Sequence, residues 1–223
     1  METPPEAITG LIADLCGNDE SLRTQASFVL GVLGDPAVEP LIALLASPSS
    51  EIRKRAAWVL GVIGAPALPA LLRMAEGGDQ HLRIEAIRVL GVVGEARALN
   101  QLFVGLTDTD PKVAARSARA IGKIGDPRAF HPLVTALQHP EPDVRYEACR
   151  ALVDLHVPDA VAVLREHATD DAGVTSWGAS VSEAARRAAD ELASAAAAPQ
   201  HAEQFARADA LLREQGAGPV DEA

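Results

Sequence analysis

The chain of 223 residues is poor in aromatic and sulfur-bearing side chains. Aromatic residues make up 3% of the sequence and hydrophobic residues 48%, so a core must be built mainly from Ala, Val, Leu and Ile. Such side chains suit helices that pack at short distances. Only two cysteines occur, Cys16 and Cys149, and their wide separation fits neither a disulfide framework nor a metal site. Two isolated thiols are typical of a reducing compartment, so we expect a cytoplasmic protein.

Excess positive charge and long apolar runs are also lacking. The net charge is −11 at pH 7 and the isoelectric point is near 5.0. Nucleic-acid affinity usually comes from a basic surface that releases counterions from phosphates, so we expect no nucleic-acid partner. No stretch reaches the roughly 18 apolar residues of a membrane span, and the first ten residues lack the pattern of a signal peptide. The sequence predicts a soluble protein that does not enter a membrane.

No arrangement of catalytic or metal-binding residues stands out. None of the six histidines has the i, i+4 spacing with a glutamate that zinc hydrolases use. No Ser/His/Asp set, glycine-rich phosphate loop or pair of catalytic carboxylates can be placed. We therefore expect no catalytic residue, no metal and no cofactor, so that the protein is not an enzyme; a small ligand stays open.

The sequence does contain a repeat. Four similar segments end in LGVLG, LGVIG, LGVVG and IGKIG, and their last glycines are Gly34, Gly64, Gly94 and Gly125. A spacing of about 30 residues is typical of stacked repeat architectures. A fifth unit has His156 in place of the glycine, and the chain opens on the second half of a unit.

Each repeat predicts a hairpin of two helices. In the first complete unit, the apolar residues up to Leu33 follow helical spacing, and Gly34 stands where a left-handed residue would end the helix. Asp35 and Pro36 are expected to cap and begin a second helix, whose apolar positions fall within residues 38–45.

A second glycine lies inside the first helix of each of the four units that end in glycine, opposite its apolar face. These positions are Gly31, Gly61, Gly91 and Gly122. An interior glycine costs a helix about 1 kcal/mol relative to alanine, so a reason is needed. We favour a close approach of first helices from adjacent units; a glycine that faces a ligand is the alternative.

The pattern LRTQASFVLGVLGDPAVEPLIALLASPS, which recurs as IRKRAAWVLGVIGAPALPALLRMAEGG and VRYEACRALVDLHVPDAVAVLREHA, resembles the HEAT-like repeats of the phycobilisome-lyase type. The resemblance covers roughly three quarters of the chain. It implies an all-α fold, a right-handed α-solenoid of about five and a half HEAT-like hairpins, with first helices on the convex side and second helices on the concave side. Such repeats serve as scaffolds, chaperone-like adaptors, chromophore lyases and a few enzymes, so the fold does not decide the function.

We predict three parts of the chain. Residues 1–168 form the repeat array, residues 169–198 a loop and a C-terminal capping helix, and residues 199–223 a terminal helix with a flexible acidic tail. Trp177 is expected to seal the end of the core, with a functional loop as the alternative. The terminal helix either docks on the array or binds another chain.

One column of arginines recurs along the repeats. It contains Arg23, Arg53, Arg83 and Arg145, and Ala114 interrupts it. We expect a structural ladder in which these residues cap helix ends and form ion pairs between units. An anion track for an acidic partner is the alternative.

Two surfaces are candidates for binding a partner. An outer strip on successive first helices contains residue types enriched in interfaces; it consists of Phe28, Trp58, Arg88, Arg119 and Arg150. Alternatively, its two aromatic rings lie flat against neighbouring helices. A mixed polar set on the concave face suits a polypeptide; it consists of Glu39, Arg73, Asn100, His131, Thr135 and Gln138.

These observations favour a non-enzymatic scaffold or adaptor that binds a partner polypeptide through the surface of the solenoid. The sequence does not choose between the concave and convex faces. The family resemblance also implies an alternative, a bilin lyase or chromophore chaperone acting on phycobiliproteins, in which arginines would hold the bilin propionates.

Overall fold

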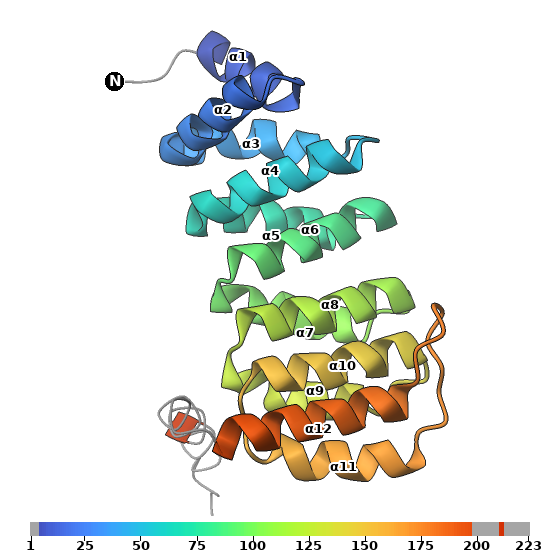
Figure 1. Ribbon diagram of the computed structural model, residues 1–223. Helices are drawn as coiled ribbons and strands as arrows, with labels where there is room; N and C mark the ends of the chain where they lie inside the picture. Colours follow the sequence, from blue (N-terminus) through green and yellow to red (C-terminus); the bar gives the residue numbers. More distant parts are fainter. Residues whose placement is uncertain (1–4, 198–209, 212–223) are drawn as a thin grey trace, which may run out of the picture. The chain divides into compact units, whose positions relative to one another are not determined.

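The computed structural model describes residues 5–197 and 210–211 (Figure 1). The chain divides into two compact units, Met1–Gln101 and Leu102–Ala223, which we describe separately. The terminal helix and tail predicted for residues 199–223 lie outside the described residues, apart from 210–211. Within the described part, no single helix is long and apolar enough to cross a membrane; Ser50–Ile63 and Ala65–Glu76 meet that criterion only as a pair bent by 115°.

The first unit is built from helices that pack in consecutive pairs. Its elements are α1 (Pro5–Cys16), α2 (Glu20–Leu33), α3 (Asp35–Leu44), α4 (Ser50–Ile63), η1 (Ala65–Ala67), α5 (Leu68–Glu76), α6 (Gln80–Val93) and η2 (Ala96–Ala98). The pairs are α1 with α2, α3 with α4, and α5 with α6, while α4 also packs against α2 and α6. Helix α7 (Leu99–Leu106) spans the boundary between the units.

The second unit continues the same pattern. Its elements are α8 (Pro111–Ile124), η3 (Pro127–Ala129), α9 (Phe130–Ala136), α10 (Pro142–Asp154), α11 (Ala160–Asp170) and α12 (Val181–Ala197). Helix α10 packs against α8 and α9, and α12 packs against α10 and α11. The predicted all-α fold of stacked helical hairpins is therefore confirmed in both units.

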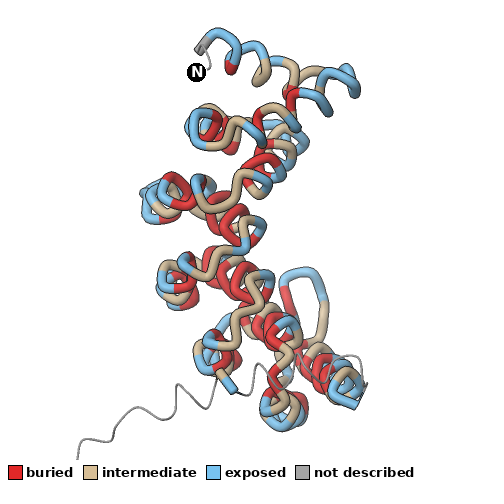
Figure 2. Tube along the Cα trace, turned by 90° about the vertical axis from the view of Figure 1, so that its left-hand side faces the viewer, coloured by how far each residue is buried: buried red, intermediate tan, exposed pale blue. Residues whose placement is uncertain are grey.

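Aliphatic side chains between the paired helices form the core of each unit. Figure 2 shows the buried residues on the sides of the helices that face one another. The largest fully buried side chains include Leu30 and Leu60 in the first unit and Leu133 and Leu152 in the second. Each such side chain contributes about 1.5–3 kcal/mol by leaving water. Both tryptophans lie outside this core, since Trp58 is 57% exposed and Trp177 is 55% exposed.

The repeated terminal glycines end the first helices, as the sequence predicts. Gly34, Gly64, Gly94 and Gly125 have φ between 66° and 71°, and His156 at the equivalent position has φ 54°. The expectation that Asp35 caps the second helix is wrong, because Gly34 occupies the N-cap position and Asp35 is already helical. In contrast, the Asp126 carboxylate does cap η3, where it accepts a hydrogen bond from the backbone N–H of Arg128 at 2.9 Å.

The interior glycines lie where adjacent first helices approach each other. A Cβ atom on Gly61 would lie 2.7 Å from Cγ1 of Val92, and one on Gly31 would lie 2.9 Å from the equivalent valine of α4. A Cβ atom on Gly122 would lie 2.7 Å from Cα of Ala151. A close approach between the first helices of adjacent repeats is therefore observed at these three positions.

Helix α12 packs against α10 and α11 at the carboxyl-terminal end of the continuously described residues. Its buried side is formed by Val181, Ala185, Ala188, Ala189 and Leu192. The expectation that Trp177 seals this end is wrong, because the loop that carries it turns back over α10. There Ser176 donates hydrogen bonds to Asp143 from both its N–H and its hydroxyl group, each at 2.7 Å, and the Trp177 ring meets Tyr146 edge-on at 5.4 Å.

Candidate functional site

Two exposed aromatic side chains lie at equivalent positions of the adjacent helices α2 and α4. Phe28 is 71% exposed and Trp58 is 57% exposed. One turn further along each helix stands an exposed valine, Val32 at 71% and Val62 at 54%. Residues four apart share one face of a helix, so these four side chains form one surface, which we call the outer apolar patch. The alternative that the two rings lie flat against neighbouring helices is not observed.

The arginines of the predicted outer strip behave differently from its aromatic residues. Arg88 on α6 pairs with Glu85, Nε donating to Oε2 at 2.8 Å. Arg119 on α8 donates from Nη1 to both carboxylate oxygens of Glu147 on α10, at 3.0 and 2.7 Å. Arg150 is exposed. The strip is therefore apolar on α2 and α4 and charged on the first helices that follow in the sequence.

Arginines of the recurring column donate hydrogen bonds to backbone carbonyl oxygens in the turn before the helix on which they lie. Arg53 donates from Nη1 to the carbonyl oxygens of Ser47 and Pro48, at 2.8 and 3.0 Å. Its Nε also donates to Glu85 on α6, in the next repeat, at 3.3 Å. Arg23 makes a longer bond of the same kind, 3.3 Å, to the carbonyl oxygen of Asn18. Arg83 occupies the equivalent position of α6.

All six residues predicted for the concave face are exposed; they are Glu39, Arg73, Asn100, His131, Thr135 and Gln138. In the first unit, Nη2 of Arg73 on α5 donates to Oε1 of Glu39 on α3 at 2.7 Å. In the second unit, the Thr135 hydroxyl donates to the carbonyl oxygen of His131 at 3.1 Å. The structure thus joins four of these six residues in two pairs, each within one unit.

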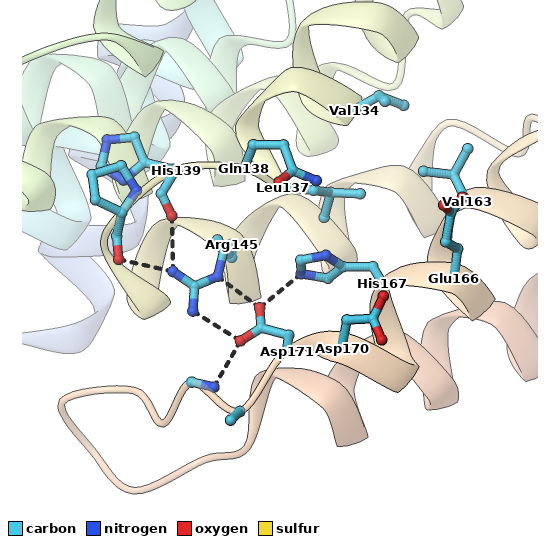
Figure 3. Close-up of a pocket in the computed structure, with 13 residues that line it drawn as sticks. Val134, Leu137, Gln138, His139, Arg145, Val163, Glu166, His167, Asp170 and Asp171 are labelled. Carbon is cyan, nitrogen blue, oxygen red and sulfur yellow. Dashed lines mark hydrogen bonds and ion pairs between the residues drawn. The ribbon is translucent and has the colours of Figure 1, made fainter.

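A groove of about 740 Å³ lies in the second unit between α9 and α11 (Figure 3). Its lining includes Val134 on α9, Leu137 and Gln138 in the turn that follows α9, and Val163, Glu166, His167 and Asp170 on one face of α11. Sequence analysis predicted only Gln138 among them. The i, i+3, i+4, i+7 spacing of the α11 residues marks a common face, but it gives no sign of the space between the two helices.

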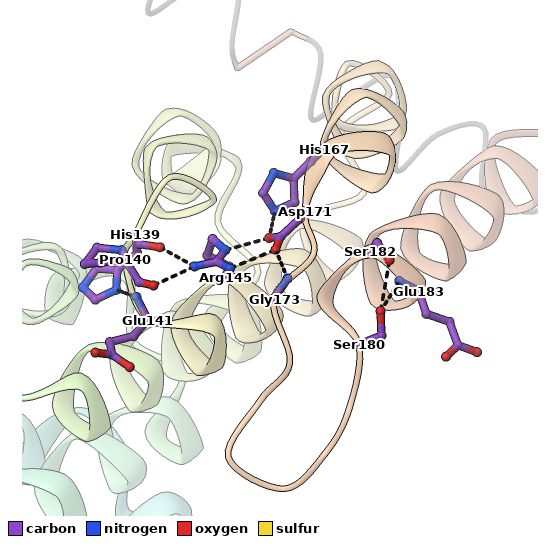
Figure 4. A network of polar contacts seen from close by, with 10 residues as sticks. All are labelled: His139, Pro140, Glu141, Arg145, His167, Asp171, Gly173, Ser180, Ser182 and Glu183. Atoms are coloured by element: carbon purple, nitrogen blue, oxygen red, sulfur yellow. Dashed lines mark hydrogen bonds and ion pairs between the residues drawn. The ribbon is translucent and has the colours of Figure 1, made fainter.

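A polar network closes one end of this groove (Figure 4). Arg145 donates to both carboxylate oxygens of Asp171, from Nε at 2.6 Å and from Nη2 at 2.8 Å. Nη1 of Arg145 donates to the carbonyl oxygens of His139 and Pro140, both at 2.8 Å. The Gly173 N–H also donates to Asp171, at 2.7 Å. The bond from Arg145 is the main reason that the pKa of Asp171 lies below its ordinary value, although burial opposes it.

His167 lies beside this network. Its Nε2 atom is 2.8 Å from Oδ2 of Asp171, and only 11% of the His167 side chain is exposed. The contact lacks the geometry of a hydrogen bond, so the buried Nε2 atom has no hydrogen-bond partner. Among the residues that the structure describes, no group of three or more His, Cys, Asp or Glu side chains could hold a metal ion.

Comparison with known proteins identifies the family. The family model of HEAT repeats matches residues 8–91, 68–138 and 99–182. These matches span most of the sequence, and the chain belongs to the HEAT-repeat proteins. The predicted resemblance to HEAT-like repeats is thus confirmed. None of the curated proteins matches the chain.

Solved structures share the fold. The complex of CpcE and CpcF of phycocyanin lyase from Nostoc sp. PCC7120 is 24% identical, with 71% of this chain and 98% of that chain covered and a TM-score of 0.60. An engineered protein is 23% identical over 84% of this chain and 97% of that chain, with a TM-score of 0.48. A designed armadillo repeat protein in complex with the peptide (KR)4 is 19% identical over 83% and 98%, also with a TM-score of 0.48. At these identities the likeness concerns the fold alone.

Proposed function

We propose that this protein is a non-enzymatic scaffold that binds a partner protein through the outer apolar patch. The observation that carries the proposal is the exposure of Phe28 and Trp58 on adjacent helices, each with an exposed valine one turn away. Contiguous apolar surface of this kind is typical of protein interfaces, where aromatic side chains provide much of the binding energy.

The charges around the patch indicate the character of the partner surface. Lys54, one turn before Trp58, is paired with Glu51 at 2.8 Å. Arg88, at the position on α6 equivalent to Trp58, is paired with Glu85 at 2.7 Å. Both cations therefore have a carboxylate partner, although Arg88 shares Glu85 with Arg53. The patch therefore fits an apolar partner surface with an uncharged centre, and we expect binding that depends weakly on salt.

The proposal is tested with a double variant, Phe28→Ala with Trp58→Ala. Partners are captured from the native cell with the wild-type chain, identified, purified and titrated against both proteins by calorimetry. We expect the double variant to lose at least about tenfold in affinity, as hot-spot residues do. Its unfolding free energy should stay within about 0.5 kcal/mol of the wild type, because both rings are largely exposed.

The matched control changes the other face. A Glu39→Ala, Arg73→Ala variant removes an exposed ion pair between α3 and α5 and leaves the patch intact. If this variant loses the partner and the patch variant keeps it, binding belongs to the predicted concave surface instead. Cytoplasmic location and the division of the chain into array, cap and terminal segment remain predictions.

A bilin lyase or chromophore chaperone is the second candidate function, supported by the likeness of fold to the CpcE and CpcF complex. Bilin propionates would need arginines that can bind them. Arg53 and Arg145 are already engaged by carbonyl oxygens and carboxylates, which favours the scaffold. Mixing the chain with a bilin and an apo-phycobiliprotein tests this candidate, since a lyase or chaperone would shift the bilin absorbance.

A further inference from the structure

We infer that the groove between α9 and α11 is a binding site for a basic side chain, lysine or arginine, of a partner polypeptide. The site lies on second helices of the second unit, whereas the outer apolar patch lies on first helices of the first unit. The inference is therefore independent of the proposed function.

The shape of the groove suits a long aliphatic chain. Val134 on α9 and Leu137 just after this helix line it on one side, and Val163 lines it from α11 (Figure 3). A volume of about 740 Å³ is within the usual range of sites that enclose a ligand group. Lysine and arginine bury their methylene stems along apolar surface while the charged group reaches polar partners. The apolar walls thus supply the contacts that the stem requires.

The charged groups that remain open in the groove are carboxylates. Glu166 and Asp170 lie one turn apart on the groove side of α11, and both are exposed. Asp170 accepts one hydrogen bond, from the Thr169 hydroxyl to Oδ1 at 3.2 Å, and its charge is not balanced by that neutral donor. Arg145, the cation of the same groove, has Nε, Nη1 and Nη2 all bound to protein oxygens. The groove therefore offers unused negative charge and a positive charge that is already neutralised, which favours a cation over an anion.

His167 lines the groove between these two carboxylates in the sequence. Its side chain is 11% exposed, and its buried Nε2 atom lies 2.8 Å from Oδ2 of Asp171. The imidazole is therefore directed at the Arg145 and Asp171 network, and Glu166 and Asp170 are the groups that would receive a cation from the partner.

A polypeptide is the fitting source of that cation. Gln138 is exposed at the rim of the groove, where its amide can both donate to and accept from a peptide backbone. The chain carries a net charge of −11, which attracts basic segments before contact is made.

The test uses the full chain and a fluorescent peptide with a central Lys-Arg-Lys segment flanked by alanines. Binding is followed by fluorescence anisotropy in low-salt and high-salt buffer, with a matched peptide that carries glutamates instead. We expect the basic peptide to bind, the acidic peptide not to bind, and affinity to fall as salt rises. Glu166→Gln combined with Asp170→Asn should weaken binding by at least about tenfold, because two charge pairs are lost.

The control variant carries Glu20→Gln and Glu76→Gln, which remove two exposed carboxylates in the first unit and the same total charge. It should bind the basic peptide like the wild type, and so should the Phe28→Ala, Trp58→Ala variant. Equal weakening by both charge variants would show attraction to net charge alone and overturn the site. Absence of binding by the wild-type chain, or unchanged binding by the Glu166 and Asp170 variant, would also overturn it.

Discussion

Arg145 and Asp171 form a bidentate ion pair, with Nε 2.6 Å from Oδ2 and Nη2 2.8 Å from Oδ1. The pair joins α10 to the residue that follows α11, and Arg145 also holds the turn between α9 and α10. Little of either side chain is exposed, 14% for Arg145 and 5% for Asp171. Arg145 thus links the turn between α9 and α10 to the start of the loop that follows α11.

Asp171→Ala is expected to lower the unfolding free energy by about 3–5 kcal/mol, because it leaves a largely buried guanidinium without its counterion. Chemical denaturation followed by circular dichroism measures the change. Glu183→Ala is the control, since its ion pair with Arg187 is largely exposed and should cost no more than about 1 kcal/mol. Similar losses in both variants would contradict the structural role of the buried pair.

The same pair predicts how stability depends on acid. The hydrogen bond from Arg145 lowers the pKa of Asp171 below its ordinary value of 3.8. A carboxyl group whose folded pKa is depressed stabilises the fold above the unfolded pKa, and this contribution is lost as pH falls through the folded pKa. Wild-type stability should therefore fall steeply below about pH 4, and that of Asp171→Ala less steeply. Parallel curves from urea titrations at several pH values would contradict this prediction.

Asp154 on α10 should show the opposite behaviour. Burial raises the pKa of Asp154, and the neighbouring Arg150 only partly compensates. A carboxyl group with a raised folded pKa disfavours the folded state once it is ionised, so its cost is present above the folded pKa and absent below the unfolded pKa. Asp154→Asn should thus stabilise the protein at neutral pH, and the gain should vanish in acid below the ordinary value of 3.8. A gain that does not change with pH would point to packing instead of charge.

The period of the sequence predicted most of the fold, because stacked hairpins are specified by local residues. Terminal glycines such as Gly34, and the apolar spacing within each helix, can be recognised in the sequence of a single repeat. The exposure of Phe28 followed from its place opposite the apolar face of α2. Contacts between distant segments left no such pattern. Spacing alone does not show that Asp171 meets Arg145, or that the loop after α11 turns back to place Trp177 beside Tyr146.

The groove between α9 and α11 escaped prediction for the same reason. Its volume depends on the distance between helices of different repeats, whereas the sequence pattern fixes only which residues share a helix face. Helical spacing places Val163, Glu166 and Asp170 on one side of α11. No pattern in the sequence shows that Val134 and Leu137 face them across the groove.

The interior glycines predict a contrast between the two units. Gly122→Ala should destabilise by about 1–3 kcal/mol, because its Cβ would lie 2.7 Å from the backbone of Ala151, which cannot move away cheaply. Gly31→Ala should have a smaller effect, since its Cβ would meet only Cγ1 of the half-exposed Val62 and alanine favours the helix by about 1 kcal/mol. Thermal and urea unfolding measure both variants. A larger loss for Gly31→Ala would contradict this account of helix approach.

The two cysteines should differ in reactivity. Burial is the main cause that raises the pKa of Cys149 to about 12, and its side chain is fully buried on α10. At pH 8 only about one molecule in ten thousand then carries a Cys149 thiolate, the reactive form. Burial raises the pKa of Cys16 as well, but this residue at the end of α1 is partly exposed. Iodoacetamide should therefore label Cys16 in the native protein and both residues in urea, as measured by peptide mass spectrometry. Native labelling of Cys149 at a rate comparable to that of Cys16 would mean that α10 opens readily, contrary to the packing observed around it.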